Sequence, residues 1–250
     1  MPALIVIPAR FNSTRLPGKP LLNRTGKYLI EHVVEQASKA KRADLVVVAT
    51  DDKRIAAAVQ SFGGRCELTK PTHLSGTDRI AEVAARPAFA RYDIVVNVQG
   101  DEPEIAPELI DELIVACSTP STGMSTAAAP VASRQELLSP NVVKVVCDQQ
   151  SSALYFSRSV IPFDREGNIT SQTDVGRCYQ KHLGIYAYRR DVLLQLAAAP
   201  PCQLECAEKL EQLRALYLGY KILVVRTNNA PHGIDTPADY EAFVARRAFV

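Results

Sequence analysis

The sequence has 250 residues, of which 47% are hydrophobic and 22% charged, and its formal net charge is +2. These values exclude a disordered chain, a collagen and a coiled coil, and so small a charge disfavours a general nucleic-acid binder. No apolar run approaches the ~20 residues that span a bilayer, and no basic region precedes the short N-terminal apolar stretch. We therefore expect a cytoplasmic protein that neither inserts into a membrane nor binds nucleic acid.

Apolar runs and amphipathic segments alternate along the first half of the chain. The sequence predicts strands at Ala3–Ile7, Leu45–Ala49, Cys66–Leu68 and Ile94–Val98. It predicts helices at Tyr28–Lys39, Ile55–Phe62, about Asp78–Ala85 and Pro107–Cys117. This repetition of strand and helix favours a parallel sheet that is covered by helices on both faces.

The second half of the chain is less regular. The sequence predicts strands at Met124–Pro130, Val142–Cys147, Leu154–Phe156, His182–Tyr188 and Lys221–Arg226. It predicts helices at Leu204–Leu218 and Thr236–Ala248, and a polar loop at Asp164–Arg177. Because no repeat or linker interrupts the chain, we expect one domain over residues 1–250. An inserted excursion would cover about 125–190.

The loop after the first strand, Pro8–Pro20, carries three cations: Arg10, Arg15 and Lys19. Ligands of open α/β sheets bind beyond the carboxyl ends of parallel strands. Backbone amides near Gly18, together with these cations, would suit a polyphosphate. Neither GxxxxGK[ST] nor GxGxxG is present, so the loop is not a Walker or dinucleotide-binding loop. A solvated basic loop is the alternative.

Two acidic positions are candidate magnesium ligands. Asp101 follows the predicted strand Ile94–Val98 beside a glycine. Asp235 precedes the last predicted helix, which Thr236 can cap, with Pro237 at its first position. Mg²⁺ is usually held by one or two carboxylates together with phosphate oxygens and water. Asp101 fits this role better than Glu102. The alternatives are a turn cap for Asp101 and a structural position for Asp235. If the two meet, they complete a two-carboxylate site.

Three further segments carry candidate binding residues. They are Ser75 and Thr77 at the start of a predicted helix, His182, Gly184 and Tyr186 on one face of a predicted strand, and Glu208, Glu211 and Gln212 on one stripe of a predicted helix. The first segment would either cap its helix or present amides to a base or ribose. Arg158 could pair bidentately with a substrate carboxylate. Structural or solvated roles are the alternative for all of them.

Nine motifs then occur in one order: IPARFNSTRLPGKPL, VATDD, SGTDRIAE, VNVQGDEP, VKVV, ALYFSRSVIPF, KHLGIYAY, KLEQLRAL and GIDTPAD. Through them the chain resembles the 3-deoxy-manno-octulosonate (Kdo) cytidylyltransferases over nearly its whole length. The motifs HLGIY and LEQLR distinguish it from the acylneuraminate cytidylyltransferases, which share mainly the nucleotide half.

The resemblance implies a three-layer α/β fold of the nucleotide-diphospho-sugar-transferase type. It implies a mixed, mostly parallel sheet and a homodimer. The nucleotide-binding part would cover about 1–120, and the excursion at about 125–190 would serve sugar binding and dimerisation. The reaction would convert CTP and Kdo into CMP-Kdo and pyrophosphate with Mg²⁺, for lipopolysaccharide biosynthesis. The anomeric hydroxyl would attack directly, without a covalent enzyme intermediate.

The resemblance also implies roles for individual residues. Arg10, Arg15 and Lys19 would contact the triphosphate; Ser75, Arg79 and Gln99 the cytosine and ribose; Asp101 and Asp235 would hold Mg²⁺; Arg158, His182, Tyr186, Glu211 and Gln212 would hold the sugar. Lys19, Arg15 and Asp101 would be the catalytic residues. The alternatives are an amino-substituted Kdo as acceptor, a cytidylyltransferase for a neuraminate or polyol phosphate, and a non-catalytic nucleotide-binding module.

Overall fold

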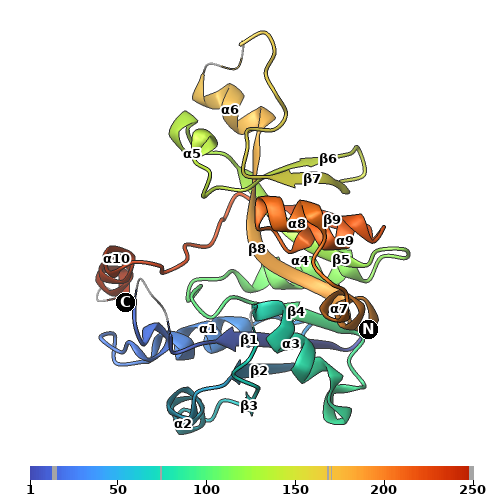
Figure 1. The fold of residues 1–250 in the computed structure, drawn as a ribbon. Helices are drawn as coiled ribbons and strands as arrows, with labels where there is room; N and C mark the ends of the chain where they lie inside the picture. The colour runs from blue at the N-terminus through green and yellow to red at the C-terminus, as the bar shows by residue number, and fades with distance from the viewer. Residues whose placement is uncertain (13–15, 74, 168, 170, 248–250) are drawn as a thin grey trace. The chain divides into compact units, whose positions relative to one another are not determined.

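A computed structural model describes residues 1–12, 16–73, 75–167, 169 and 171–247 of the chain (Figure 1). The chain divides into two compact units. Unit 1 consists of Met1–Ile114 and Pro231–Val250, and unit 2 consists of Val115–Ala230. Unit 2 is thus inserted between two segments of unit 1, and the expected excursion at 125–190 lies within it.

The strands of unit 1 are β1 (Ala3–Ala9), β2 (Leu45–Thr50), β3 (Cys66–Leu68) and β4 (Ile94–Asn97). They pair in parallel in the order β3-β2-β1-β4. Residues 3–7 of β1 have no exposed surface, as expected of a central parallel strand that is covered on both faces. Pro8 pairs with Ala49 and Val6 with Asn97, so the carboxyl ends of these three strands lie at one edge.

The α-helices of unit 1 are α1 (Leu29–Ala37), α2 (Lys53–Ser61), α3 (Gly76–Ala85) and α10 (Pro237–Arg247), with short 3-10 helices η1 (Lys19–Leu21) and η2 (Pro87–Phe89). Helix α4 (Pro107–Cys117) begins in unit 1, and its residues 115–117 belong to unit 2. Their starts follow sequence signals: the Asp52 side chain caps α2, and the Ser75 hydroxyl caps α3. Leu29, Ile234 and Phe243 share one apolar cluster, which holds the C-terminal segment against α1.

The strands of unit 2 are β5 (Met124–Pro130), β6 (Lys144–Cys147), β7 (Ala153–Ser157), β8 (Gln180–Arg189) and β9 (Ile222–Arg226). β5 runs antiparallel to β8 and parallel to β9, and β6 runs antiparallel to both β7 and β8. The helices are α5 (Arg134–Leu138), α6 (Gln172–Cys178), α7 (Arg190–Ala198), α8 (Gln203–Glu208) and α9 (Gln212–Tyr217). The expected mixed, mostly parallel α/β architecture is confirmed.

The single helix predicted at Leu204–Leu218 is wrong, because the chain forms two short helices there. Lys209 ends α8 with a φ of 54°, in the left-handed region that a continuing helix does not allow. Glu208 therefore ends α8, Glu211 is the residue before α9, and Gln212 is its first residue. The three do not share one helical stripe.

The loop predicted at Asp164–Arg177 is wrong at its end, where α6 begins at Gln172. The hydroxyl of Ser171 accepts the Asp174 N–H, and this local cap starts a short polar helix that has no apolar periodicity to detect. Helices α5 and α7 were not predicted either. None of the helices in the described part of the chain is long and apolar enough to cross a membrane.

Candidate functional site

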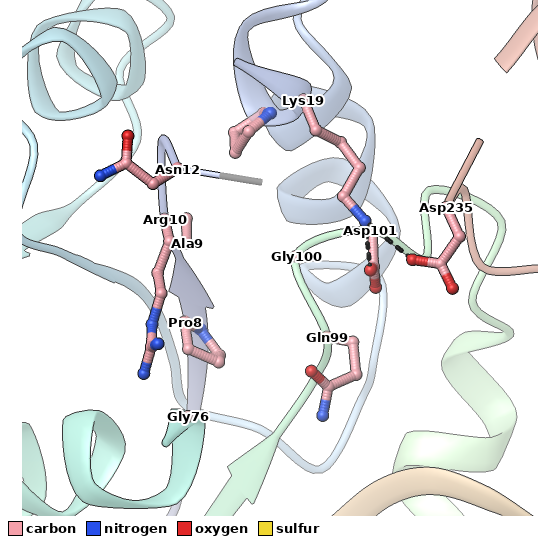
Figure 2. Close-up of a pocket in the computed structure, with 11 residues that line it drawn as sticks. Pro8, Ala9, Arg10, Asn12, Lys19, Gly76, Gln99, Gly100, Asp101 and Asp235 are labelled. Carbon is pink, nitrogen blue, oxygen red and sulfur yellow. Dashed lines mark hydrogen bonds and ion pairs between the residues drawn. The ribbon is translucent and has the colours of Figure 1, made fainter. Parts of the chain in front are cut away.

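A cavity of about 380 Å³ lies in unit 1, beyond the carboxyl ends of β1 and β4 (Figure 2). Five predicted residues line it: Arg10, Lys19, Gln99, Asp101 and Asp235. They come from three segments, the loop after β1, the loop after β4 and the segment before α10. The fold therefore brings the predicted basic loop and both predicted acidic positions to one place, as the rule for open α/β sheets requires.

Lys19 lies between the two carboxylates in this cavity (Figure 2). Its Nζ is 2.6 Å from Asp101 Oδ2 and 3.2 Å from Asp235 Oδ1, and it also donates to the carbonyl oxygen of Ile234 at 2.7 Å. The Lys19 side chain is 13% exposed. All three ammonium protons therefore have an oxygen acceptor, and the two carboxylates converge on one cationic centre.

Two glycines allow the loops to approach one another. A Cβ on Gly100 would lie 2.7 Å from the backbone oxygen of Pro8, closer than real Cβ contacts, so only glycine lets these two backbones pack so tightly. Gly18 has a φ of +67°, the left-handed conformation, and its N–H donates to the carbonyl of Phe11. This turn leads directly into Lys19 and aims it at the cavity.

Asp101 and Glu102 are neighbours with different environments. The Asp101 side chain is 29% exposed and lines the cavity, whereas Glu102 is buried. Burial, together with the charge of Asp101, raises the pKa of Glu102 to about 8. Glu102 is therefore mostly protonated at neutral pH, and Asp101 is the carboxylate that faces the cavity, as the sequence analysis preferred.

Asp235 is fixed by the start of α10. The Asp239 carboxylate accepts the N–H groups of Asp235 and Thr236, and the Thr236 hydroxyl accepts the Asp239 N–H. The adjacent Ile234 donates its N–H to the carbonyl of Asp101 at 2.8 Å. The helix cap predicted at Thr236 is confirmed, and it also sets the position of Asp235.

The metal-binding capacity of this site depends on two carboxylates. Across the described residues, no group of three or more His, Cys, Asp and Glu side chains is arranged to hold a metal. Asp101 and Asp235, however, already share one cation, the Lys19 ammonium. Two converging carboxylates beside open space are a set that fits Mg²⁺ when phosphate oxygens and water supply the remaining ligands.

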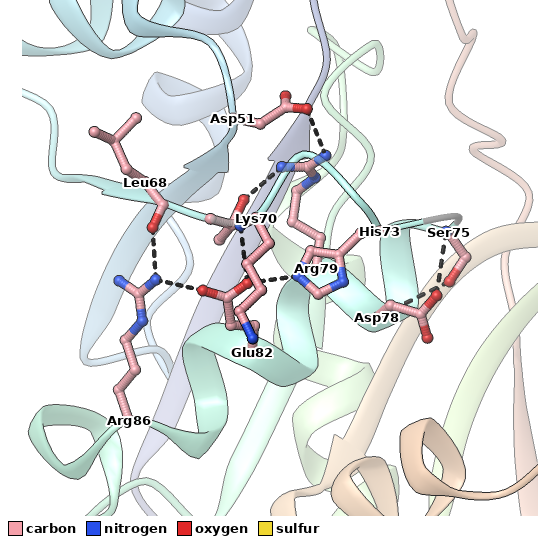
Figure 3. A network of polar contacts seen from close by, with 10 residues as sticks. Asp51, Leu68, Lys70, His73, Ser75, Asp78, Arg79, Glu82 and Arg86 are labelled. Carbon is pink, nitrogen blue, oxygen red and sulfur yellow. Dashed lines mark hydrogen bonds and ion pairs between the residues drawn. The ribbon is translucent and has the colours of Figure 1, made fainter.

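The other predicted nucleotide residues lie nearby in unit 1. Arg10 also lines an adjacent cavity of about 230 Å³, and its buried NH2 group has no hydrogen-bond partner within the described ranges. Arg79 has no exposed surface; it donates to the Thr69 hydroxyl and pairs with Asp51 at 3.3 Å (Figure 3). Arg15 lies outside the described residues. Of the two roles predicted for Ser75, the helix cap is the one that has a contact within the described residues. The Ser75 hydroxyl accepts the N–H of Asp78 at 3.1 Å.

A larger cavity of about 810 Å³ lies elsewhere in unit 1. It is lined by α1, by the first residues of β2 and by the segment that follows α2. It thus lies at the amino end of β2, the end at which ligands of parallel sheets are not expected. Size alone does not make it the better candidate, and the cavity with the predicted residues remains the functional site.

In unit 2, the predicted sugar residues of β8 form an aromatic cluster. The ring of His182 lies 5.3 Å from that of Tyr186 and 5.1 Å from that of Phe156. Its Nε2 is 2.9 Å from the hydroxyl of Thr126. Burial lowers the pKa of His182 to about 3 and raises the pKa of Tyr186 well above its ordinary value. Both side chains are therefore neutral polar groups at physiological pH.

Glu211 and Gln212, at the start of α9, have different environments. The charge of Glu211 contributes to the raised pKa of Tyr186. Gln212 is 6% exposed, and in the described part of the chain its Nε2 has no hydrogen-bond partner. Arg158 instead contacts backbone: its Nε donates to the carbonyl of Glu208 at 2.7 Å and its NH1 to that of Pro140 at 2.9 Å.

Two residues that hold the Arg158 backbone, Lys144 and Glu208, were not predicted in this role. The buried Lys144 donates to the carbonyls of Val142 and Arg158, and Glu208 accepts the Arg158 N–H at 2.9 Å. A lysine inside the apolar run Val142–Cys147 was a detectable signal, because a buried ammonium must find acceptors. Glu208 was a candidate only through a predicted helical stripe, which the structure does not contain.

Comparison with known proteins identifies the family of the chain and its relatives. The cytidylyltransferase family profile matches residues 4–222. The chain is 51% identical over 242 residues to 3-deoxy-manno-octulosonate cytidylyltransferase of Geobacter sulfurreducens, covering 94% of this chain and 95% of that protein. It is 47% identical over 242 residues to the protein of the same name from Yersinia pseudotuberculosis serotype O:1b, with 96% of each chain covered.

Solved structures agree with these relatives. A structure of CMP:2-keto-3-deoxy-manno-octonic acid synthetase complexed with CTP superposes with a TM-score of 0.91 at 43% identity, covering 100% of this chain and 99% of that one. The 4-diphosphocytidyl-2C-methyl-D-erythritol synthase of Anaerococcus prevotii gives a TM-score of 0.61 at 13% identity, covering 98% and 97% of the two chains. The second likeness shows the fold alone, and with it the expected fold type is confirmed.

Proposed function

The chain belongs to the cytidylyltransferase family, among the 3-deoxy-manno-octulosonate cytidylyltransferases, and we propose that the cluster of Lys19, Asp101 and Asp235 carries its reaction. The protein transfers CMP from CTP to the anomeric hydroxyl of Kdo and releases pyrophosphate. The new bond joins the anomeric oxygen to the α-phosphorus, and the bond that breaks joins this phosphorus to the bridging oxygen of the pyrophosphate.

The observation that carries the proposal is the position of the Lys19 ammonium within 3.2 Å of both carboxylates. A non-catalytic nucleotide-binding module would not need two converging carboxylates beside a lysine at the mouth of a parallel sheet. The buried NH2 of Arg10 in the same cavity has no hydrogen-bond partner among the described residues, and it gives further support, since an anionic ligand would satisfy it.

We propose that Mg²⁺ binds to Asp101 and Asp235 when the nucleotide is present. Bound there, it would polarise the α-phosphate and lower the pKa of the attacking hydroxyl. The carboxylates are suited to this because they are held from different segments and already converge on a positive charge. Chelation by EDTA should abolish pyrophosphate release, and added Mg²⁺ should restore it.

The protein groups themselves would act by position and charge. We propose that Lys19 and Arg10 contact the triphosphate, together with Arg15, which lies outside the described residues. Phosphoryl and nucleotidyl transfers depend mainly on in-line positioning and on stabilising charge in the transition state. Lys19 would stabilise the charge that develops on the departing pyrophosphate. Gln99 and Ser75 would hold the ribose and base.

We propose that His182, Tyr186, Glu211 and Gln212 bind the sugar. The low pKa of His182 and the high pKa of Tyr186 support this, because neutral rings can exchange hydrogen bonds with sugar hydroxyls. The Nε2 group of the buried Gln212 has no hydrogen-bond partner within the described ranges and could donate to such a hydroxyl. Arg158 contacts three backbone carbonyls, so a direct contact with the Kdo carboxylate would require some of these bonds to be exchanged.

We also propose that the protein is a cytoplasmic homodimer. Large apolar side chains are exposed in unit 2, among them Leu154 at 61% and Phe163 at 83%. Exposed apolar surface of this kind favours contact with a second chain. Light scattering after size-exclusion chromatography should give twice the mass of 27.3 kDa. A monomer at micromolar concentration would contradict the dimer without affecting the proposed chemistry.

The function is tested by measuring pyrophosphate release from CTP and Mg²⁺. The acceptors are Kdo, 8-amino-Kdo, N-acetylneuraminate and none, and the Kdo reaction is repeated with UTP. We expect pyrophosphate release only from the combination of CTP and Kdo. Faster release with the amino sugar would change the acceptor and keep the mechanism. Tight CTP binding without release for any acceptor would support a non-catalytic module instead.

A further inference from the structure

A polar network in unit 1 joins the loop after β3 to helix α3 (Figure 3). Glu82, which lies on α3, is at its centre. One carboxylate oxygen, Oε2, accepts the N–H of Lys70 at 3.0 Å and lies 2.5 Å from Nε2 of His73. The other oxygen, Oε1, accepts from NH2 of Arg86 at 2.8 Å. A single side chain thus connects two points of the loop at 69–73 to the helix.

Arg86, at the end of α3, connects Glu82 to β3. Its NH1 donates to Glu67 at 2.6 Å, and its NH2 donates to the carbonyl of Leu68 at 2.6 Å, so the helix end is also connected to β3. Burial alone would raise the pKa of Glu82, but the hydrogen bonds from the Lys70 N–H, His73 and Arg86 outweigh it and lower the pKa to about 2. Glu82 is therefore a firmly ionised acceptor at the junction of loop, helix and strand.

The loop that Glu82 holds lines a cavity next to the proposed nucleotide site. His73 and Pro71 line the cavity of about 230 Å³ together with Arg10 and Asn12. Arg10 and Asn12 also line the cavity that contains Lys19 and the two carboxylates. Displacement of the loop would therefore change the surroundings of Arg10, although Glu82 itself is not among the residues that line either cavity.

We propose that Glu82 is a positioning residue for CTP, which acts by fixing the loop at 69–73 against α3 beside Arg10. This inference rests on the proposed function of the site. The alternative is that Glu82 stabilises the fold and has no effect on the nucleotide. The two differ in their kinetic signature, because a positioning residue changes the affinity for one substrate, whereas a fold-stabilising residue changes the amount of active enzyme.

The test compares Glu82→Gln with the matched control Glu112→Gln. Glu112 is an exposed glutamate on α4, also in unit 1. It forms no ion pair with any other described residue. The glutamine at position 82 keeps the size but removes the charge and one acceptor oxygen. Steady-state pyrophosphate release is measured well below the melting temperature, with either CTP or Kdo varied. We expect the KM for CTP to rise by roughly three- to tenfold, with kcat and the KM for Kdo changing less than about twofold.

A second variant keeps the proposal testable if Glu82→Gln does not fold. His73→Gln removes one of the loop contacts and should raise the KM for CTP by a smaller factor. In the double variant the two effects should be less than multiplicative, because both changes release the same loop. An unchanged KM for CTP in folded Glu82→Gln, or equal effects on both substrates, would overturn the proposal.

Failure of the inference can be told apart from failure of the proposed function. If the wild-type enzyme releases no pyrophosphate from CTP and Kdo, the proposed function is wrong. If the wild type is active and Asp101→Asn is not, but Glu82→Gln behaves like Glu112→Gln, only the positioning role of Glu82 is wrong.

Discussion

The N–H of Ile234 donates to the carbonyl of Asp101 at 2.8 Å, and this bond joins two segments that lie far apart in the sequence. The two carboxylates lie next to this bond: one belongs to Asp101 itself, and the other to Asp235, the residue that follows Ile234. The carbonyl of Ile234 also accepts a hydrogen bond from the Lys19 ammonium. Ile234 itself is buried among apolar residues of α1 and α10, so the core of unit 1 sets the distance between the two carboxylates.

Asp101→Asn should remove most activity and leave the fold intact. The substitution keeps the shape of the side chain but removes one of the two charges around Lys19, and we expect kcat to fall by about 10²- to 10³-fold. Pyrophosphate release and thermal unfolding should be measured on the same preparation. Near-normal turnover in Mg²⁺ would exclude Asp101 as an essential ligand.

Lys19→Met should increase the affinity of the substrate-free protein for Mn²⁺ while turnover is lost. The ammonium lies between the two carboxylates, where it competes with any metal ion. Its removal leaves two negative charges in one cavity, and we expect binding to tighten by about tenfold, or about 1.4 kcal/mol. Electron paramagnetic resonance counts free Mn²⁺ directly. Equal affinities in wild type and variant would show that Lys19 does not occupy the metal position.

Gly100→Ala should destabilise the protein and lower its activity. The added Cβ would lie 2.7 Å from the backbone oxygen of Pro8, so the loops after β1 and β4 must separate. We expect a loss of roughly 1–3 kcal/mol in the free energy of unfolding by urea. Gly233→Ala is the control, since a Cβ there meets nothing within 4 Å and its stability should change by less than about 0.5 kcal/mol. Equal stabilities for the two variants would contradict the close approach.

Glu82 should contribute to stability in a defined pH range. Its pKa is about 2 in the folded protein and near the ordinary 4.5 when unfolded, so the unfolded state binds the proton first as the pH falls. The contribution is therefore complete above about pH 4.5 and is lost as the pH falls toward 2. Urea unfolding of wild type and Glu82→Gln should show a difference in stability that shrinks across this range. A difference that is independent of pH would mean that the charge of Glu82 has no role in stability.

His182 should remain neutral through the whole working range of the enzyme. Its enclosed position lowers its pKa to about 3, so its imidazole resonances should not titrate above about pH 5 in an NMR series. A midpoint near pH 6.5 for His182 would show that the ring is open to water and would change the proposed hydrogen bonding to the sugar.

The order of strands and helices and the family were readable in the sequence. Continuous apolar runs predicted the buried parallel strands of unit 1, and the comparisons confirm the family that the motifs indicated. Local signals also predicted the caps at Ser75 and Thr236. Strands and helix caps depend mainly on residues that are close together in the sequence, so they can be predicted from the sequence alone.

Only the tertiary structure decided what each candidate side chain contacts. The motifs did not reveal that Lys19 bridges Asp101 and Asp235, that Arg79 is fully buried, or that Arg158 binds backbone carbonyls. Nor did they reveal that Glu82 holds the loop before α3. Such contacts join residues separated by up to 216 positions, and they form only when the core brings distant segments together. The sequence determines which chemical groups are available, and packing determines which of them meet.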